Sequence, residues 1–407
     1  MSDQRTFDPG IRGSVAVLPD APALWSYSSL KAAETCPRRY VLSRATYADL
    51  WNHTGYPEVP SPAALFGDVV HDSLETIVRA LAAQGCTSAS GPEAISLLRE
   101  LGGYSEVAKA MLAKRLARLD DNPRLAGCGR ERLQDQLEHR IPEAREEVQH
   151  YLHRMTLVPR QGAGSGPNSR GASPRYARVV GSHPEATLQA DELRAWGRID
   201  LLTVGPVQVD ITDYKTGAED ESHFDQLRFY AVLWDQDNVS NSSRTPLGTL
   251  TASYPNREVT IEAPDAAQVQ TLAQQLRARV TTADELVHSD EPAARPGDHC
   301  AFCAVRPLCT AYWPTTPEPA SLKRGSWFDF EGTVVERNGT KSWWLHDLGP
   351  RKGPLLLRTT SAHHAFEPGQ RLRLLGLRRD EDPDSEVAVA VLAQTSEVFV
   401  VTGESDY

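Results

Sequence analysis

"WGRIDLLTVGPVQVDITDYKTG", residues 196–217, carries the strongest chemical signal in the sequence. The stretch contains two strand-like segments; Asp200 ends the pattern of the first, and Asp213 lies in the second. Lys215 follows Asp213 by two residues, so on a strand both side chains project from the same face. The Thr-Gly pair at 216–217 predicts a tight turn that opens a site at the strand end. Two carboxylates that converge with a lysine are what a hard divalent cation and a water nucleophile require.

Such a group of side chains suits hydrolysis of a phosphate ester. Mg²⁺ prefers oxygen ligands and keeps positions open for waters and a substrate phosphate. It lowers the pKa of a bound water and polarises the phosphoryl oxygen, while an adjacent ammonium orients that water or stabilises the developing charge. An isolated D-x-K pair, however, is more often a solvated strand face.

Two helical pairs flank these strands and favour a functional site. Gly67 and His71 in "GDVVH" form a G-x-x-x-H pattern on an expected helix. Gln226 and Tyr230 are four residues apart on the helix expected after the Thr-Gly turn, so they share one face of it. Each pair alone is commonly a packing feature. Because all four residues flank the same strand pair in order, a role in packing alone becomes a weaker explanation for them.

The composition bounds the class of protein. The chain has 407 residues, of which 24% are charged and 40% hydrophobic, as in ordinary globular proteins of two or three structural units. It has no apolar run of the roughly 20 residues that cross a bilayer. The first residues, "MSDQRTFDPG", lack the features of a signal peptide, so we expect a cytoplasmic protein. The net charge of −11 argues against nonspecific coating of nucleic acid and is compatible with carboxylates gathered around metal ions.

The pattern along the chain predicts a helical first part followed by strands and helices. Residues 1–22 are rich in Pro, Gly and Asp and are expected to form a flexible arm. A helix is expected from Ser26, with Pro37 ending it, and others at 66–85, 92–118, 130–157, 222–236 and 264–288. The Gly/Ser/Pro stretch 160–175 is expected to be a flexible loop. Strands are expected on both sides of the central stretch and at 247–254 and 257–261.

The last part of the chain is expected to fold separately. Residues 313–325 read as a Pro-rich linker. Five or six short strands follow within 326–407, which predicts a small β-barrel, OB-like in the first place and SH3-like in the second. An OB-like barrel binds single strands by aromatic stacking and a basic groove. Candidates for such contacts are Trp343, Trp344, Arg351, Lys352, Arg358, Arg371, Arg373, Arg378 and Arg379. The acidic residues Asp380, Glu381, Asp382 and Asp384 keep a structural or protein-docking role equally open.

The cysteines are unevenly grouped. The six are Cys36, Cys86, Cys128, Cys300, Cys303 and Cys309. The last three form a C-x2-C-x5-C pattern, which can clamp one ion and needs one further ligand. Zinc accepts four thiolates, and so does a [4Fe–4S] cluster. The spacing alone does not choose between them, and His299 could complete a zinc knuckle.

In order along the chain, "SSLKAAETCPRRY", "GDVVH", "GRID", "DYKTG", "QLRFY" and the final cysteines resemble the PD-(D/E)XK nuclease superfamily. Within it they resemble the RecB-type nuclease domains, including AddB and the CRISPR-associated RecB-like exonucleases. The resemblance spans residues 26–312, and in "GRID" the carboxylate follows Ile199 rather than proline, a variant that is normal in RecB-like members. It implies an α/β fold with a restriction-endonuclease-like core, extending over 23–312 with its helical N-terminal part.

The resemblance also implies roles for individual residues. Asp200 and Asp213 bind Mg²⁺ or Mn²⁺, with the Tyr214 backbone carbonyl as a further ligand. Lys215 positions or activates the attacking water, and His71 contributes to the metal site. Gln226 and Tyr230 orient the region of Lys215 or contact the nucleic-acid backbone. The expected reaction is hydrolysis of DNA phosphodiesters, by exonuclease action on single strands or ends.

For the cysteines, the resemblance implies a structural [4Fe–4S] cluster. Iron–sulfur members use one cysteine before the nuclease core and three after it, so Cys36 joins Cys300, Cys303 and Cys309. Cys86 and Cys128 match nothing and are expected to be spectators. Arg38 and Arg39 either neutralise the charge of the cluster or touch phosphate.

The sequence also bears on the biological context of the expected nuclease and on the alternatives to it. It has no G-x-x-x-x-G-K-[ST] phosphate loop, so ATP-driven unwinding would need a helicase partner. A place in DNA repair, CRISPR-type or anti-phage defence is therefore expected. The alternatives are a catalytically silent, nuclease-like DNA-binding scaffold and an RNA nuclease. Asp200, Asp213 and Lys215 argue against the silent scaffold.

Overall fold

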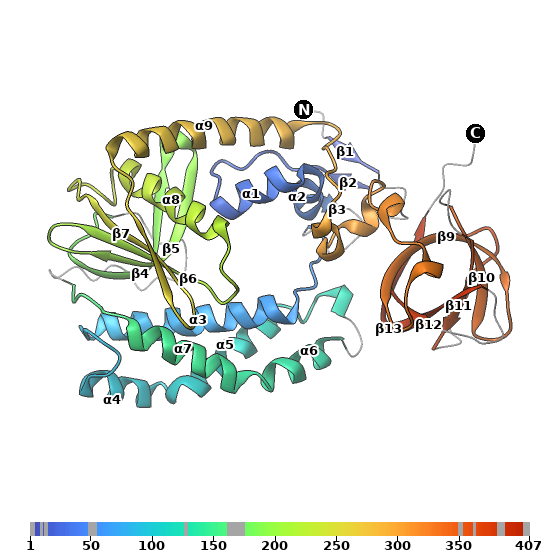
Figure 1. The fold of residues 1–407 in the computed structure, drawn as a ribbon, viewed down its shortest axis with the longest axis horizontal. Helices are drawn as coiled ribbons and strands as arrows, with labels where there is room; N and C mark the ends of the chain where they lie inside the picture. The colour runs from blue at the N-terminus through green and yellow to red at the C-terminus, as the bar shows by residue number, and fades with distance from the viewer. Residues whose placement is uncertain are drawn as a thin grey trace. The chain divides into compact units, whose positions relative to one another are not determined.

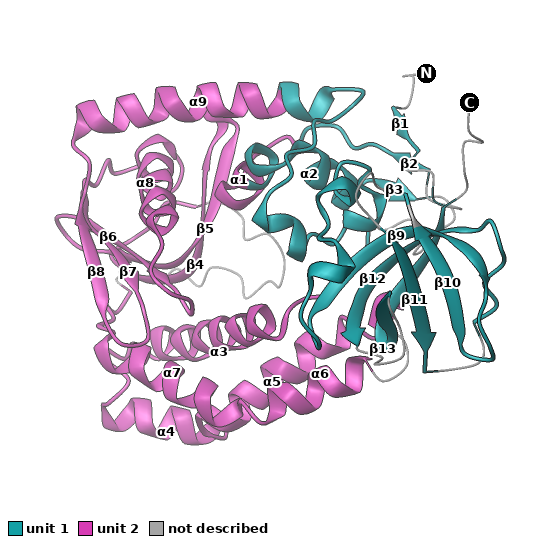
Figure 2. Ribbon diagram, turned by 45° about the vertical axis from the view of Figure 1, so that its right-hand side comes forward, with its two compact units in different colours: residues 1–21, 32–58, 285–407 teal, residues 22–31, 59–284 magenta. Residues whose placement is uncertain are grey.

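The computed structural model describes residues 5–8, 11, 15–47, 55–125, 129–160, 176–348, 353–360, 364–380 and 387–401. It contains two compact units (Figure 2). Unit 1 comprises Met1–Ala21, Ala32–Glu58 and Glu285–Tyr407, and unit 2 comprises Pro22–Lys31 and Val59–Asp284. The loop expected at 160–175 lies, except for its first residue, outside the described residues.

Unit 2 is built on a five-stranded sheet in the order β4-β5-β6-β7-β8 (Figure 1). The strands are β4 (Gly181–Ala190), β5 (Ala195–Val204), β6 (Val209–Tyr214), β7 (Leu247–Ser253) and β8 (Glu258–Glu262). Neighbours pair antiparallel except β6 and β7, which are parallel. Parallel strands end at the same sheet edge, and there the Lys215 N–H donates to the Ser253 carbonyl at 2.8 Å. The D-x-K pair is thus tied to the sheet by a backbone hydrogen bond.

Helices cover this sheet and extend from it. They are α3 (Pro62–Ala83), α4 (Pro92–Glu100), α5 (Gly103–Ala117), α6 (Gly129–Glu138), α7 (Ile141–Arg154), α8 (Glu221–Gln236) and α9 (Ala266–His288), with short 3-10 turns η2 (Pro123–Leu125) and η3 (Asp191–Leu193). Helix α8 packs against β4, β5, β6 and β7. One hydrophobic cluster joins α3, α5 and α7 to Leu201 of β5 and Tyr214 of β6. This core holds α3, the helix that carries His71, against the strands that carry the carboxylates.

Two helices expected to be continuous are each divided in two. The helix expected at 92–118 breaks between α4 and α5, where Gly102 and Gly103 have φ of 85° and 82°, a conformation that glycine adopts without strain. The helix expected at 130–157 breaks between α6 and α7, with Pro142 in the first turn of α7.

A further difference lies at Cys36. The helix expected from Ser26 forms α1 (Tyr27–Thr35), and a second helix, α2 (Pro37–Arg44), follows it directly. Cys36 itself is extended, with φ −155° and ψ 101°, and Pro37 starts α2 instead of ending the helix before it. A proline suits this first position because no intrahelical hydrogen bond is lost there.

Unit 1 holds a small sheet and the cysteine segment. Strands β1 (Thr6–Phe7), β2 (Ala16–Val17) and β3 (Thr46–Tyr47) pair antiparallel. Two of them lie within the segment expected to be a flexible arm. The cysteine segment contains the 3-10 turns η4 (Asp298–Phe302) and η5 (Arg306–Leu308), and the expected linker contains η6 (Trp313–Thr315) and η7 (Pro319–Ser321).

The end of unit 1 is the β-barrel expected from the sequence. Its strands are β9 (Trp327–Arg337), β10 (Ser342–Asp347), β11 (Pro354–Thr359), β12 (Arg371–Asp380) and β13 (Ala388–Val401), closed in the order β10-β11-β13-β12-β9. Strands β11 and β13 pair in parallel and all other neighbours antiparallel. Side chains from all five strands fill its hydrophobic core.

The residues considered for single-strand binding differ in how exposed they are on the barrel. Trp343 lies in its core and Arg373 is buried, so both are structural. Arg378 is exposed, and Trp344 and Arg358 are half-buried. Arg351, Lys352, Glu381, Asp382 and Asp384 lie outside the described residues.

Candidate active site

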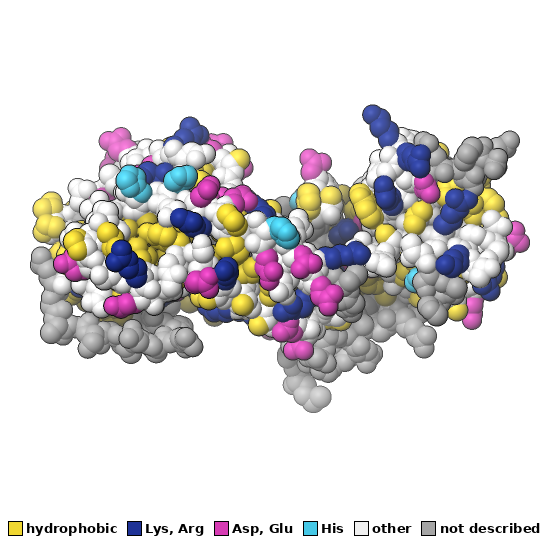
Figure 3. All heavy atoms as spheres, turned by 90° about the horizontal axis from the view of Figure 1, so that it is seen from below, with side chains coloured by type: hydrophobic (Ala, Val, Ile, Leu, Met, Phe, Trp, Pro, Cys, Tyr) yellow, Lys and Arg dark blue, Asp and Glu magenta, His cyan; other side chains and the backbone are white. Residues whose placement is uncertain are grey.

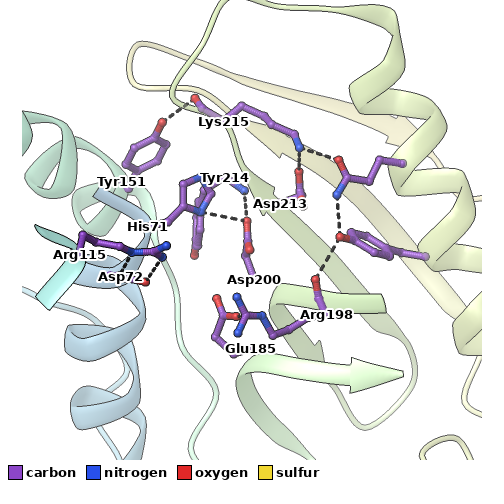
Figure 4. A network of polar contacts seen from close by, with 12 residues as sticks. His71, Asp72, Arg115, Tyr151, Glu185, Arg198, Asp200, Asp213, Tyr214 and Lys215 are labelled. Atoms are coloured by element: carbon purple, nitrogen blue, oxygen red, sulfur yellow. Dashed lines mark hydrogen bonds and ion pairs between the residues drawn. The ribbon is translucent and has the colours of Figure 1, made fainter. Parts of the chain in front are cut away.

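The two aspartates lie on adjacent strands of the sheet. Asp200 is on β5 and Asp213 on β6, and both point toward the same space (Figure 4). The Tyr214 N–H donates to Asp200 Oδ2 at 2.7 Å, which fixes that carboxylate against the neighbouring strand. Asp213 Oδ2 forms an ion pair with Lys215 Nζ. The structure therefore brings the two carboxylates and the lysine together, as the spacing predicts.

His71 approaches this group from α3. Its Nδ1 lies 3.8 Å from Asp200 Oδ2. The helix can come this close because Gly67, one turn earlier, has no side chain: a Cβ there would lie 2.7 Å from Thr216 Oγ1 in the D-x-K turn. The glycine of the G-x-x-x-H pattern thus permits the contact that places the histidine.

Gln226 and Tyr230 extend the network from Lys215. Lys215 Nζ donates to Gln226 Oε1 at 2.8 Å, and Gln226 Nε2 donates to the Tyr230 hydroxyl at 2.7 Å. The Tyr230 hydroxyl donates to the Arg198 carbonyl on β5 at 3.0 Å (Figure 4). A Cβ at Gly197 would lie 2.8 Å from Tyr230 Cε1, so the glycine of "GRID" makes room for this ring. The chain of hydrogen bonds holds the lysine in one orientation.

Burial makes the two negative charges costly. The Asp213 side chain is 3% exposed and that of Asp200 15%. Burial raises the pKa of Asp213 to about 6, with the charge of Asp200 adding to the rise and Lys215 opposing it. Burial likewise raises the pKa of Asp200 above its usual range, and it lowers the pKa of His71. A cation bound between these groups would offset the cost of their charges.

A third carboxylate, which sequence reasoning missed, lies near the site. Glu185 on β4 has a side chain 8% exposed, and its Oε2 forms an ion pair with Arg198 Nε at 2.6 Å. Burial, with the charge on Asp200 adding to the rise, raises the pKa of Glu185 to about 8. Glu185 has φ of 53° and lies between Pro184 and Ala186, which pair with Leu201 and Ile199 on either side of Asp200. No spacing rule in the sequence predicts this placement beside Asp200, so the residue could not be singled out.

Two further contacts hold the surroundings of the site. The Tyr151 hydroxyl of α7 donates to the Lys215 carbonyl at 2.7 Å. Arg115 of α5 donates twice to Asp72 of α3, from Nε and Nη2, both at 2.7 Å. Because Asp72 follows His71 directly, this bidentate pair fixes the turn of α3 that carries the histidine (Figure 4). The tyrosine and arginine lie far from the motifs in sequence, and no spacing rule connects them.

The oxygen and nitrogen donors fit a divalent metal. Within the described residues, no group of three His, Cys, Asp or Glu side chains is already closed around a single point. Asp200 and Asp213 nevertheless share one space with His71 at its edge, and hard cations prefer carboxylate oxygens. These residues would hold the ion.

Four free thiols line one pocket in unit 1. They belong to Cys36, Cys300, Cys303 and Cys309, and residues near 36 and 300 are thus brought together as the resemblance implies. Burial raises the pKa of Cys303 to about 11 and also raises that of Cys309. Arg39 opposes the first shift and Arg38 the second. Thiolates are the ligands of zinc and of a [4Fe–4S] cluster, although within the described residues no three of these thiols are already closed around a single point.

The two arginines after Cys36 differ in role. Arg38 is buried, and its Nε donates to the Pro292 carbonyl at 2.9 Å. Arg39 is half-buried and lines the four-cysteine pocket. Cys86 lies apart from that pocket, packed against the helical core of unit 2, and Cys128 lies outside the described residues.

A family model places the chain in its class. The model described as "PD-(D/E)XK nuclease superfamily" matches residues 24–310, more than half of the chain. The chain belongs to the PD-(D/E)XK nuclease superfamily. Membership implies a metal-dependent phosphodiester hydrolase, and the motif residues described above lie within the matched range. The search of curated proteins gave no match.

Solved structures give weaker likenesses. The OB domain of a Methanosarcina mazei protein has 14% identity and a TM-score of 0.18, over 20% of this chain and 79% of that one. The p204 HINb domain has 17% identity and a TM-score of 0.19, over 27% of this chain and 55% of that one. A murine DNA-binding protein bound to double-stranded DNA has 9% identity and a TM-score of 0.18, over 55% of this chain and 96% of that one. Scores this low carry no argument about the fold or the function of this chain.

None of the helices in the described part of the chain combines the length and the apolar character needed to cross a bilayer.

Proposed function

We propose that this protein is a RecB-like, divalent-metal-dependent DNA nuclease that degrades single strands or DNA ends. The observation that carries the proposal is the unbroken set of contacts from Asp213 through Lys215 and Gln226 to Tyr230. A silent scaffold would not need a half-buried lysine held in one orientation beside the buried Asp213 and the half-buried Asp200, whose charges destabilise the metal-free fold. The superfamily membership supports the reaction class.

The chain's own residues prepare the reaction. When bound, the divalent ion supplies a water of lowered pKa and polarises the scissile phosphate. Asp200 and Asp213 hold it, with the Tyr214 carbonyl as a further donor and His71 at the edge. Lys215 orients the attacking water and offsets charge that develops on the phosphate oxygens. Gln226 keeps the ammonium pointed at the site, and the buried Tyr230 keeps Gln226 in place.

The test is cleavage of end-labelled single-stranded DNA with Mg²⁺ or Mn²⁺, with single-stranded RNA as a second substrate. Lys215→Ala and Asp213→Ala should each reduce the rate by at least about a hundredfold. Asp225→Asn, which changes an exposed carboxylate on α8, should keep the wild-type rate. Cleavage that survives both site substitutions would refute the assignment. Binding of DNA without cleavage by the wild type would instead establish the scaffold alternative, and faster cleavage of RNA the other one.

We further propose that Cys36, Cys300, Cys303 and Cys309 hold a structural [4Fe–4S] cluster. Four free thiols around one pocket support a metal, and the resemblance to iron–sulfur nucleases supports iron over zinc. Cys36 lies 264 positions before Cys300, so the cluster would close a long loop of chain and remove entropy from the unfolded state. The protein purified without oxygen should be brown and contain iron. Cys36→Ser should lose the iron and Cys86→Ser should keep it; a colourless, zinc-loaded protein would exclude the cluster.

We infer that the barrel is OB-like and acts beside a nuclease domain at 23–312. A five-stranded closed barrel with one parallel pair between its third and fifth strands supports this inference. On the face drawn in Figure 3, Lys and Arg side chains are spread among acidic and hydrophobic ones. A helicase or defence-complex partner is proposed because the sequence has no phosphate-binding loop; co-purification from the native source tests it.

A further inference from the structure

Asp329 of the barrel lies between the four-cysteine pocket and the barrel strands. Its carboxylate is buried on β9. Oδ2 accepts from Arg306 Nε at 2.6 Å and from the Tyr312 hydroxyl at 2.7 Å. Oδ1 accepts from the Gly376 N–H of β12 at 2.8 Å. Arg306 and Tyr312 both line the four-cysteine pocket, so one side chain contacts the pocket wall and the barrel together.

A second buried side chain joins the same two parts. Arg373 of β12 is 2% exposed, and its Nη1 donates to the Pro307 carbonyl at 2.8 Å. Pro307 lies between Cys303 and Cys309 in the sequence. Arg373 Nε donates to Glu331 Oε1 of β9 at 2.7 Å, and its guanidinium lies over the Trp313 ring, 5.4 Å from the centroid. Two charged groups of the barrel are therefore satisfied by the cysteine segment.

These contacts are sensitive to the position of the cysteine segment. A buried carboxylate or guanidinium that loses its partner is left with an uncompensated charge. Arg306 is tied to the segment as well, because its Nη1 donates to the Cys303 carbonyl at 3.2 Å. The Gly376 N–H bonded to Asp329 belongs to a bulge of β12, where φ is 65° and the pairing with β9 shifts register. A movement of the cysteine segment would therefore be transmitted to this bulge of β12 by the Asp329 carboxylate.

We propose that Asp329 couples the four-cysteine pocket to the barrel, so that metal held by the cysteines and the folded barrel stabilise each other. This inference rests on the proposed metal site. Coupling of this kind is reciprocal: if the metal stabilises the barrel, the barrel strengthens metal binding by the same factor. The nuclease carboxylates take no part in it. The folded barrel thus helps to retain the metal.

The experiment compares hydrogen exchange of the full chain, metal-loaded and after chelation, over β9 (Trp327–Arg337) and β12 (Arg371–Asp380). In the wild type, chelation should speed exchange in both strands by about tenfold, within the usual range of coupling between sites. In Asp329→Asn, exchange there should already be fast and change little on chelation, and the metal should pass to a chelator about tenfold faster. Tyr312→Phe, which removes one of the two donors to Oδ2, should give smaller changes of the same sign and replaces Asp329→Asn if that variant does not fold.

The control is Glu336→Gln, which changes an exposed carboxylate on the same strand and should behave as the wild type. Chelation that speeds exchange around Cys300–Cys309 but leaves β9 and β12 unchanged would overturn the coupling while leaving the metal site intact. Metal content is measured first. A wild type that binds neither iron nor zinc would refute the four-cysteine site itself, and the coupling with it.

Discussion

Replacing Asp213 by asparagine should stabilise the metal-free protein at neutral pH, although it removes a proposed metal ligand. Burial raises the pKa of Asp213 from 3.8 to about 6. Each pKa unit corresponds to about 1.36 kcal/mol, so holding the charged carboxylate in the folded state costs about 3 kcal/mol at pH 7.5. Asparagine resembles the protonated acid and avoids this cost. For a unit of more than 200 residues, the gain corresponds to a rise in Tm of about 6–12 °C.

The pH dependence follows from the direction of the shift. A carboxyl group whose folded pKa is raised destabilises the fold progressively from its unfolded pKa up to its folded one, here between about pH 4 and pH 6. The advantage of Asp213→Asn should therefore be full above pH 7 and about half as large at pH 5. Urea unfolding with chelator at both pH values measures it. Asp225→Asn is the control, because an exposed carboxylate should change the free energy of unfolding by less than about 0.5 kcal/mol.

Divalent metal should make the wild type more stable to unfolding than Asp213→Asn, the reverse of the order expected in chelator. Mg²⁺ or Mn²⁺ bound by the deprotonated carboxylates stabilises the folded wild type, in proportion to its concentration over its Kd. The same ions should leave Asp213→Asn nearly unchanged. Two results in chelator would refute the argument from buried charge. One is that Asp213→Asn is no more stable than the wild type, and the other is that its gain in the free energy of unfolding does not shrink between pH 7.5 and pH 5.

Three further substitutions test how the site is held. Gly197→Ala should destabilise by about 1–3 kcal/mol and lower kcat, because its Cβ would lie 2.8 Å from the Tyr230 ring; wild-type unfolding and turnover would contradict this. Arg115→Ala leaves the buried Asp72 unpaired and should cost about 3 kcal/mol, measured by urea unfolding, while an unchanged midpoint would refute it. Tyr151→Phe removes a hydroxyl bonded to a backbone carbonyl and should cost about 1 kcal/mol, with kcat reduced more than KM is raised; a change in KM alone would argue against positioning.

The central part of the fold could be predicted because its signals are local. Strand alternation and the D-x-K spacing placed Asp213 and Lys215 on one face, and the structure has them in contact. Helix ends were less visible: the Gly102–Gly103 pair marks a break by itself, yet the apolar spacing continued across it. The barrel was visible from its short strands, but its closure depends on a parallel pair between β11 and β13, which no local pattern reveals.

The rest of the site depends on tertiary approach. Nothing in the sequence distinguishes Glu185 from other acidic residues, since its position beside Asp200 follows from the pairing of β4 with β5. Cys36 could be joined to the distant cysteines only through the resemblance to a family, because spacing gives no partner for a lone thiol. Arg115 and Tyr151 act through contacts with residues 43 and 64 positions away. A single sequence gives no means of finding such pairs.

Two glycines in the sequence motifs connect what the sequence predicts to the tertiary contacts that it does not predict. Gly67 lies against the Thr216 side chain, and Gly197 lies under the Tyr230 ring; in both places a Cβ would be less than 3.0 Å from its neighbour. Each glycine is therefore a point where a helix meets the strand pair, and each lies in the same motif as a residue that the contact positions. A glycine beside a candidate catalytic residue, with no turn to explain it, is best taken as a prediction of close packing. That prediction names no partner, but it says that one exists within van der Waals distance.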